Sequence, residues 1–226
     1  PARLAKILVD QKPDIVGLQE LSHSQAETLT QLISSEYPYR SVFPDGFAGK
    51  AILSRFPISK TSQVHLGPER PDLLVSLTID GFQLSVISAH PPPPRFQKTK
   101  FGFEPGTLEQ IRSLASLTIE NQPAILLGDF NFVSRQDEHQ TIKSAGLRDA
   151  FLESGRGAGY TLPRRIGPWR RMRWLNSLLS WVPLIPVVRV DYIWYTEQLS
   201  CTSCWVGDDA GSDHMPVFAR LKIGVM

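Results

Sequence analysis

The sequence predicts a mixed α/β layer fold in a single domain over residues 1–226. Helical and strand patterns are interspersed along the chain, and tight-turn residues join consecutive strand patterns in its middle. At this length the chain can bury a substantial core. The hydrophobic fraction of 42% and the charged fraction of 20% place it among globular proteins.

The first elements are two helices with a short buried strand between them. An apolar stripe predicts a helix over residues 2–12. The apolar run at residues 15–18 predicts a strand, which delivers Glu20 just beyond its end. A second helix is expected over residues 24–35, with Ser24 as its N-cap.

The middle of the chain is expected to form consecutive strands. Asp80-Gly81 lies between two of them and is a strong signal for a tight hairpin. Four prolines at positions 91–94 then impose an extended segment. The expected strands cover residues 39–43, 48–54, 58–66, 72–79 and 82–90.

Helices and strands alternate again in the second half. A helix is expected over residues 107–120, followed by a strand that ends in Asp129. Ser134 is the expected N-cap of another helix that extends to Ala145. The final strands are expected over residues 190–195, 201–206 and 217–222.

The two cysteines, Cys201 and Cys204, are interpreted as structural. Their C-x-x-C spacing is also found in redox and zinc sites, but no second Cys/His pair with zinc-site spacing accompanies them. Both lie in an expected strand, where residues three apart point to opposite faces. Two cysteines cannot make a disulfide framework.

An arginine-rich, tryptophan-rich insert occupies residues 156–189. It holds seven arginines and no Lys, Asp or Glu, although the net charge of the whole chain is only +2. The basic character is therefore local, and so the surface that meets a partner is expected to be local too. The insert lies in sequence between Asp149 and Asp191, so we expect it to border the functional face.

Three interpretations of this insert remain open. Arg beside Trp and an apolar stretch, over residues 164–188, suits an anionic membrane surface. The same composition suits stacking on single-stranded nucleic acid. The third interpretation is a surface loop whose apolar residues cover the edge of the fold. The apolar stretch is too short and too interrupted by proline to span a bilayer.

Two short polar motifs follow or precede apolar runs. Gly128-Asp129-Phe130-Asn131 follows one run, and its Asp129 and Asn131 share a face if the backbone is extended. Ser212-Asp213-His214 precedes another run. Carboxylate and amide oxygens suit a hard cation, and His suits proton transfer near neutral pH. Taken singly, each motif is also compatible with a polar surface turn.

Three further polar residues lie at or within strand patterns. Asp191 interrupts an apolar strand, so its carboxylate needs a partner, either an imidazole or one of Arg189 and Arg220. Glu20 follows a strand end and is a candidate metal ligand, or else the first residue of a loop. His90 ends another strand, where a lone His is more often structural.

Together, in order, these residues resemble the endonuclease/exonuclease/phosphatase superfamily, which has the deoxyribonuclease I-like fold. The resemblance covers most of the chain, from residue 14 to residue 216. The matching strings are Asp14-Ile-Val-Gly-Leu-Gln-Glu20, Ser88-Ala-His90, Gly128-Asp-Phe-Asn131, Val190-Asp-Tyr-Ile193 and Ser212-Asp-His-Met-Pro216.

The resemblance implies a four-layer α/β/β/α sandwich of two mixed β-sheets with helices outside. It also implies hydrolysis of a phosphate ester with Mg²⁺ or Mn²⁺. The metal would be held by Glu20 as the principal ligand, with Asp213 and Asp129 as further carboxylates. Substrate class stays open among nucleic acid, phospholipid headgroup and small phosphate esters, and we expect a monomer.

The resemblance also implies roles for the remaining residues. Asp129 would orient or deprotonate the attacking water, and Asn131 would contact the phosphate. His214 would bind the phosphate or act as general acid or base, oriented by Asp191. His90 would be a second imidazole that contacts the phosphate or donates a proton. The alternative is a non-catalytic module that binds lipid or nucleic acid and keeps the fold.

One departure from the family is expected to matter. The family opens with a strand that ends in an Asn of the metal site, whereas here the first helix begins at residue 2. We therefore expect the first strand to be absent from this chain. The resemblance is closest to bacterial members that often carry N-terminal membrane segments, so membrane association of the parent protein is an open expectation.

Overall fold

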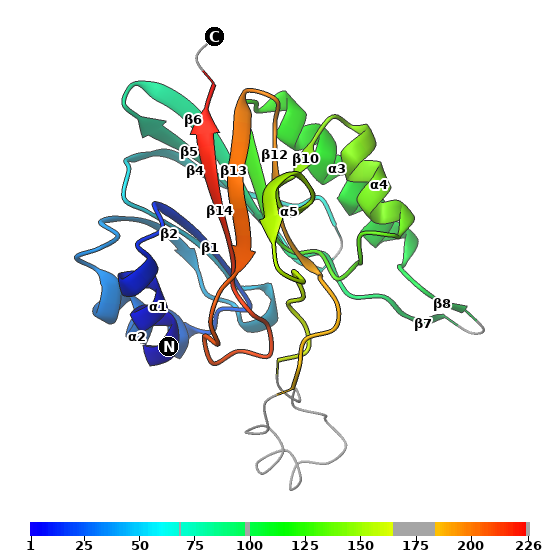
Figure 1. The fold of residues 1–226 in the computed structure, drawn as a ribbon, viewed down its shortest axis with the longest axis horizontal. Helices are drawn as coiled ribbons and strands as arrows, with labels where there is room; N and C mark the ends of the chain where they lie inside the picture. Colours follow the sequence, from blue (N-terminus) through cyan, green and yellow to red (C-terminus); the bar gives the residue numbers. More distant parts are fainter. Residues whose placement is uncertain (68, 98–99, 165–183, 225–226) are drawn as a thin grey trace, which may run out of the picture.

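The computed structural model describes residues 1–67, 69–97, 100–164 and 184–224, and it has the expected four layers (Figure 1). Two β-layers pack face to face. Helices cover the outer face of each layer, as the resemblance implies. The sandwich architecture expected from the sequence is therefore confirmed.

One β-layer is a six-stranded sheet with the order β10-β12-β9-β6-β5-β4. Its neighbours are antiparallel except for β6 and β9, which pair in parallel through the long α3 crossover. Its strands are β4 (Ile58–Val64), β5 (Asp72–Ile79), β6 (Phe82–Ala89), β9 (Ala124–Asp129), β10 (Arg148–Asp149) and β12 (Asp191–Tyr195).

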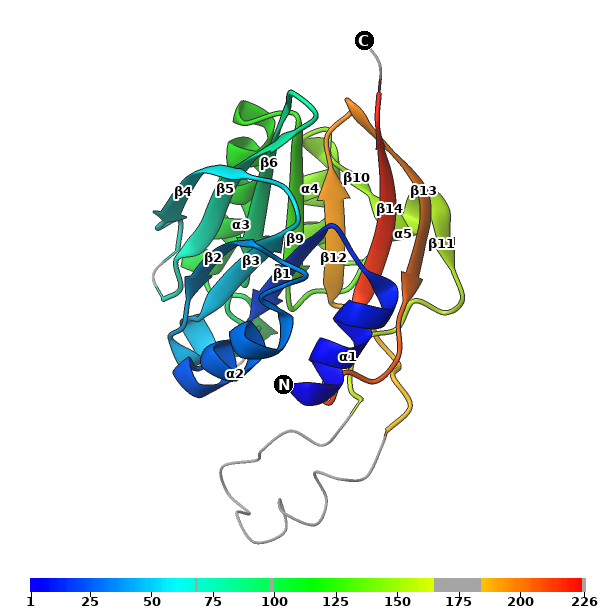
Figure 2. The same cartoon turned by 90° about the vertical axis from the view of Figure 1, so that its left-hand side faces the viewer.

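The other β-layer consists of two three-stranded sheets, β1-β3-β2 and β11-β13-β14 (Figure 2). A separate hairpin, β7 (Arg95–Gln97) and β8 (Lys100–Gly102), projects from the body. The strands of the two sheets are β1 (Ile15–Gln19), β2 (Tyr39–Phe43), β3 (Lys50–Ser54), β11 (Gly155–Arg156), β13 (Leu199–Val206) and β14 (Val217–Ile223).

Three groups of buried apolar residues hold the layers together. One lies between the β-layers, one lies beneath α1 and α2, and one lies beneath α3 and α4. Burying apolar side chains on both faces of a sheet is the main stabilising contribution in such a fold. The helices are α1 (Ala2–Gln11), α2 (His23–Ile33), α3 (Pro105–Glu120), α4 (Asp137–Ser144) and α5 (Ala150–Ser154), with a 3₁₀ turn, η1 (Gly46–Ala48).

The Asp80-Gly81 turn forms as expected. Ile79 pairs with Phe82, and both central residues have positive φ, 49° for Asp80 and 84° for Gly81. A two-residue turn with both φ values positive matches the right-handed twist of the strands it joins. This hairpin sets the register of β5 and β6, which leads to the site described below.

Three helix starts differ from the sequence expectation, and the first of these is α3, which begins at Pro105, two residues before the expected start. The N-cap of α2 is Ser22 rather than Ser24, because the Ser22 hydroxyl accepts from the Gln25 N–H while the Gln25 side chain accepts from the Ser22 N–H. Gln is one of the two residues that complete a capping box at this position. α4 begins at Asp137, three residues beyond the expected cap at Ser134, and it ends at Ser144.

Most of the Arg/Trp insert, residues 165–183, lies outside the described residues, so the interpretations given to it remain predictions. Cys201 and Cys204 are free thiols, and Cys204 is buried at the inter-sheet core. None of the helices in the described part of the chain is long and apolar enough to cross a membrane.

Candidate active site

The core of the site is built on three neighbouring strands, β12, β9 and β6. Asp191, the first residue of β12, pairs directly with Asp129, the last residue of β9. Ala89, the last residue of β6, pairs with Gly128, so His90 emerges beside Asp129. Strand pairing thus gathers three polar side chains from positions far apart in the sequence at one edge of the sheet.

Gly128 makes this close pairing possible. Its φ is +144°, and a Cβ at this position would lie 1.9 Å from the Ala89 carbonyl oxygen. Only glycine adopts such a backbone conformation without strain and leaves room for the neighbouring carbonyl. The close approach of β9 to β6 therefore explains why the Gly-Asp-Phe-Asn motif begins with glycine.

His214 is held by Asp191. The imidazole Nδ1 lies 2.9 Å from Asp191 Oδ2, and the Thr161 hydroxyl donates to the same carboxylate. Burial lowers the pKa of His214, but the hydrogen bond to Asp191 and the charges of Asp191, Asp129 and Asp213 outweigh it and raise the pKa to about 10. His214 is therefore an imidazolium whose Nε2 stays available to a ligand.

Asp129 lies between two imidazoles. Its Oδ2 is 3.4 Å from His90 Nε2 and 3.9 Å from His214 Nε2. Its Oδ1 accepts a hydrogen bond of 2.9 Å from the Asn131 N–H. Asn131 has a φ of 57°, which Asn tolerates better than most residues. This turn fixes the Asp129 carboxylate with one oxygen directed at both imidazoles.

Glu20 comes from the opposite β-layer. It follows β1 with a φ of 55°, and its Oε1 lies 3.7 Å from His90 Nε2, the atom that also neighbours Asp129. Burial raises the pKa of Glu20, and the nearby carboxylates of Asp213 and Asp129 add to it, while His90 and Arg70 oppose it. The site therefore takes residues from both β-layers.

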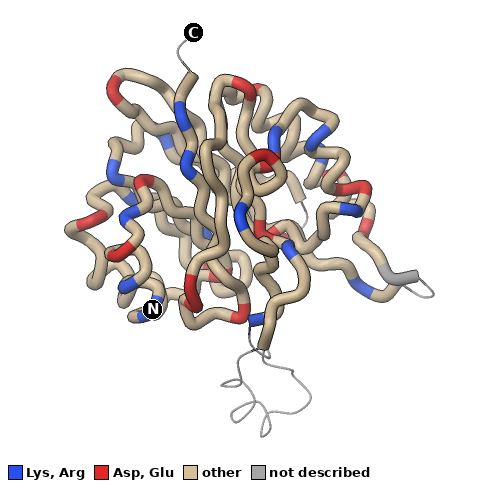
Figure 3. Tube along the Cα trace, in the orientation of Figure 1, with Lys and Arg blue, Asp and Glu red and all other residues tan. Residues whose placement is uncertain are grey.

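The remaining two sequence-predicted residues border the same cluster. The Asn131 side chain donates to the Pro91 carbonyl oxygen at 3.0 Å, which ties the proline segment to the site. Asp213 Oδ1 accepts from the Ser212 hydroxyl at 3.2 Å, and its charge raises the pKa of both Glu20 and His214. All seven sequence-predicted residues thus lie at one end of the sandwich, where Figure 3 shows several acidic residues.

The donor set suits a hard divalent cation. Asp129, Asp191 and His214 form a group whose possible ligand atoms lie within 4.8 Å of one another. Asp191 and His214, however, already bind each other. Glu20 lies near the carboxylates of Asp129 and Asp213, whose charges raise its pKa, and oxygen ligands of this kind are those that Mg²⁺ and Mn²⁺ prefer.

Arg70 also belongs to the site, although no sequence pattern predicted it. Its Nη1 lies 2.8 Å from Nε2 and 3.0 Å from Nδ1 of His90, and its charge lowers the pKa of Glu20. Arg70 precedes β5, and a loop arginine is unremarkable in a sequence. Only the pairing of β5 with β6 brings it to His90.

A buried polar group behind the site holds this arrangement. Lys50 donates to the Pro71 carbonyl oxygen at 2.7 Å, and Asp72 accepts from Gln110 at 2.9 Å and from the His90 backbone N–H. Lys50, Asp72 and Gln110 are all buried. They fix the backbone on either side of the Arg70–His90 contact.

A second buried group anchors the start of β12. Arg189 makes two hydrogen bonds of 2.8 Å to Asp149, which also accepts from His139 at 2.9 Å. Burial raises the pKa of Asp149, but these donors outweigh it and lower the pKa overall. The sequence alternative that paired Arg189 with Asp191 is therefore wrong, since each has another partner.

The described end of the insert touches the site. The Arg164 N–H donates to the Asp213 carbonyl oxygen at 2.6 Å, and the Arg164 guanidinium lies 3.3 Å from Asp209. The chain therefore enters the insert directly beside the Ser212-Asp213-His214 segment.

Comparison with known proteins identifies the family of the chain. The model of the Endonuclease/Exonuclease/phosphatase family matches residues 1–214, and the chain belongs to this family. A putative neutral sphingomyelinase of Caenorhabditis elegans is 40% identical over 62 residues, which cover 26% of this chain and only 14% of that protein.

Solved structures share the fold at low identity. An endonuclease/exonuclease/phosphatase family protein from Leptotrichia buccalis aligns with a TM-score of 0.71 and 18% identity, over 98% of this chain and 92% of that one. Sphingomyelinase C from Streptomyces griseocarneus aligns with a TM-score of 0.67 and 18% identity, over 96% and 90%. At these identities the likeness concerns the fold.

Proposed function

We propose that this chain is a divalent-metal-dependent hydrolase of phosphate esters. The observation that carries the proposal is the position of Asp129 Oδ2, between the Nε2 atoms of His90 and His214 and next to Glu20. A carboxylate, two imidazoles and a second carboxylate around one space suit the binding of a phosphoryl group and the activation of water beside it.

Each residue of the site has its own role in the proposed reaction. Asp129 accepts a proton from the attacking water, the water oxygen bonds to phosphorus, and the bond from phosphorus to the leaving oxygen breaks. His214, charged and oriented by Asp191, donates its proton to that leaving oxygen. Asn131, His90 and Arg70 contact the non-bridging oxygens. Mg²⁺ or Mn²⁺ held by Glu20, Asp129 and Asp213 would polarise the phosphoryl group.

A chromogenic phosphodiester assay tests the proposal. We expect turnover with Mg²⁺ or Mn²⁺, none with EDTA, and a loss of roughly 10²–10⁴-fold in His214→Ala and Asp129→Asn. His65→Ala and Asp137→Asn replace exposed residues of the same types and serve as matched controls. Lack of turnover with either metal would instead favour the non-catalytic binding module.

The class of phosphate ester that the chain hydrolyses is a second, separate part of the proposal. Two of the similar proteins are named as sphingomyelinases, one of them putatively, so sphingomyelin is the first substrate to test. A panel with plasmid DNA, abasic DNA, phosphoinositides and nucleotides covers the other classes. The highest kcat/KM identifies the class, and it also decides between a phosphodiesterase and a phosphatase.

An anionic membrane surface is the partner that we propose for the insert. Its described end at Arg164 borders Asp213, so a surface bound there would place lipid headgroups beside the site. Co-sedimentation with anionic and with neutral vesicles tests this directly. Binding to anionic vesicles that weakens with salt is expected, and no binding to either would refute it.

A further inference from the structure

Thr161 lies in the loop between β11 and the described end of the Arg/Trp insert, and it is fully buried. A buried residue outside the helices and strands needs a partner for each of its polar groups. Thr161 makes four hydrogen bonds, and all of them lead to the two segments that carry Asp191 and His214. The reaction proposed above uses neither its hydroxyl nor its backbone.

The backbone of Thr161 ties these two segments together. Its N–H donates to the Val188 carbonyl oxygen at 2.8 Å, and its carbonyl oxygen accepts from the Met215 N–H at 2.9 Å. Val188 lies three residues before Asp191, and Met215 directly follows His214. The segment that carries the carboxylate and the segment that carries the imidazole are therefore joined at one residue.

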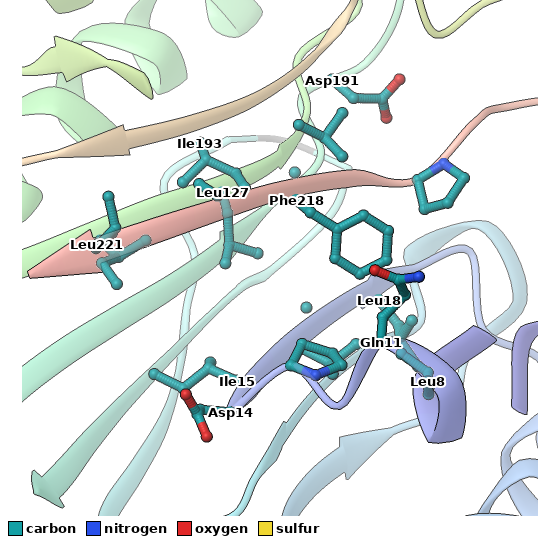
Figure 4. Close-up of a pocket in the computed structure, with 18 of the residues that line it drawn as sticks. Leu8, Gln11, Asp14, Ile15, Leu18, Leu127, Asp191, Ile193, Phe218 and Leu221 are labelled. Atoms are coloured by element: carbon teal, nitrogen blue, oxygen red, sulfur yellow. The ribbon is translucent and has the colours of Figure 1, made fainter. Parts of the chain in front are cut away.

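The hydroxyl of Thr161 acts on Asp191 itself. It accepts from the Val190 N–H at 3.2 Å and donates to the Asp191 carboxylate. Because the backbone N–H can only donate, the hydroxyl proton is left for the carboxylate. Asp191 thus receives hydrogen bonds from two side chains, the Thr161 hydroxyl and the His214 imidazole. Figure 4 shows its carboxylate directed away from the apolar side chain of Ile193.

We propose that Thr161 is a positioning residue for the His214–Asp191 pair, a role that rests on the proposed phosphoesterase function. Hydrogen bonds from two directions fix the plane of a carboxylate, whereas a single one lets it rotate. The imidazole accordingly keeps the orientation in which its Nε2 lies 3.9 Å from Asp129 Oδ2. This orientation affects the chemical step, because a small misplacement of a proton donor slows the transfer of its proton.

Two substitutions separate this role from a role in packing. Thr161→Val keeps the shape of the side chain but removes the hydroxyl, whereas Thr161→Ser keeps the hydroxyl but removes the methyl group. If Thr161 only fills space, Ser is the more damaging replacement. If its hydroxyl positions Asp191, Val is the more damaging one, because it removes a partner from both the buried carboxylate and the Val190 N–H.

The matched control is Thr196→Val, at the opposite end of the same two strands. Thr196 is buried, and its hydroxyl accepts from the Ala124 N–H at 2.9 Å and donates to the Ala124 carbonyl oxygen at 3.4 Å. Ala124 is the first residue of β9, whereas Asp129 is the last, and Thr196 directly follows β12. The control therefore removes a buried hydroxyl with the same kinds of hydrogen bond, but away from the site.

The first measurement is the hydrolysis of a chromogenic phosphodiester with Mg²⁺. We expect kcat to fall roughly 10–100-fold in Thr161→Val, with KM nearly unchanged. Thr161→Ser and Thr196→Val should keep kcat within about threefold of the unmodified chain, although all three variants lower Tm. An equal loss of kcat in Thr161→Ser and Thr161→Val would overturn the proposal, because packing would explain both. Unchanged kcat in Thr161→Val would overturn it as well.

The second measurement does not depend on hydrolysis. Nδ1 of His214 lies 2.9 Å from Asp191 Oδ2, and NMR follows the exchange of its proton with solvent. We expect this exchange to be at least about tenfold faster in Thr161→Val, and unchanged in Thr161→Ser and Thr196→Val. Equal exchange in all four proteins would refute the positioning role, whether or not they hydrolyse phosphodiesters. Faster exchange in Thr161→Val alone, with no turnover by any of them, would support the positioning role and count against the proposed function instead.

Discussion

At the scale of single residues, the pairing of His214 with Asp191 is the contact that most affects the chemistry. The Asp191 carboxylate fixes the imidazole through Nδ1 and, with Asp129 and Asp213, keeps it protonated despite burial. A protonated, oriented imidazole can neutralise charge on a phosphoryl oxygen and then release a proton.

Replacing Asp191 by Asn tests this role. We expect kcat to fall roughly 10²–10⁴-fold, because the imidazole loses its orientation and part of its charge. The pKa of His214 should fall from about 10, which an NMR titration of the ring measures. Unchanged activity with a lowered pKa would show that the protonated form is not required.

Arg70 should act on substrate binding. Since its guanidinium already lies against His90, we expect Arg70→Gln to raise KM by roughly tenfold, the equivalent of one charge-assisted hydrogen bond, with a smaller effect on kcat. Arg112→Gln, on the exposed face of α3, is the matched control. A loss confined to kcat would contradict a role in binding.

At the scale of elements, the close approach of β9 to β6 is the most demanding feature. Gly128→Ala would place a methyl group 1.9 Å from the Ala89 carbonyl oxygen in a backbone conformation with φ +144°. We expect a loss of about 3 kcal/mol or more in the free energy of unfolding, and a loss of activity as Asp129 shifts.

The matched control for that substitution is Gly102→Ala in β8, where an added Cβ would meet nothing. Urea denaturation of both variants gives the comparison, and the expected change for the control is within about 1 kcal/mol. If the two substitutions cost the same, the close approach of the strands is not what requires glycine.

Asp72, the first residue of β5, makes the stability of the folded chain depend on pH. Burial raises the pKa of Asp72 from 3.8 to about 6, although Lys50, Gln110 and the His90 N–H oppose it. The folded state therefore holds this proton more tightly than the unfolded state. The contribution of Asp72 to the unfolding free energy falls by up to about 3 kcal/mol as pH rises from about 4 to about 6.

Asp72→Asn removes this titration while keeping the shape of the side chain. The difference in unfolding free energy between the variant and the unmodified chain should therefore grow in favour of the variant across that pH range. Asp80→Asn, at the exposed tip of the β5–β6 hairpin, controls for the loss of one carboxylate. A difference that does not vary with pH would show that Asp72 titrates as it does in the unfolded chain.

The sequence predicted the elements whose signals are local. The Asp80-Gly81 turn, the strand that ends at Asp129 and the short strand before Glu20 all follow from turn chemistry and apolar runs. Helix starts were less predictable, because Ser22 and Ser24 are both acceptable caps, and only the side chain of Gln25 decides between them.

Residues that act through tertiary contacts gave no such signal. Arg70 contacts His90 only because β5 pairs with β6. Arg189 binds Asp149 rather than Asp191 only because β10 pairs with β12. The convergence of the predicted residues could be inferred from the family resemblance, but not from spacing. The absence of the family's first strand remains a prediction.

At the scale of the whole molecule, the site exists only because two β-layers face each other. One layer contributes Glu20, and the other contributes His90, Asp129 and Asp191. Neither layer alone assembles the group of side chains to which we assign the cation and the phosphoryl group. Loosening the contact between the layers should therefore lower metal affinity before it unfolds the chain.

The most direct test of the central claim is a double-mutant cycle on metal-dependent phosphodiester hydrolysis with Asp129→Asn, His214→Ala and both together. If the two side chains act on one phosphate in one site, the double variant should lose about as much activity as the more damaged single variant. Losses that simply multiply would show that the two residues act independently, which would contradict the account.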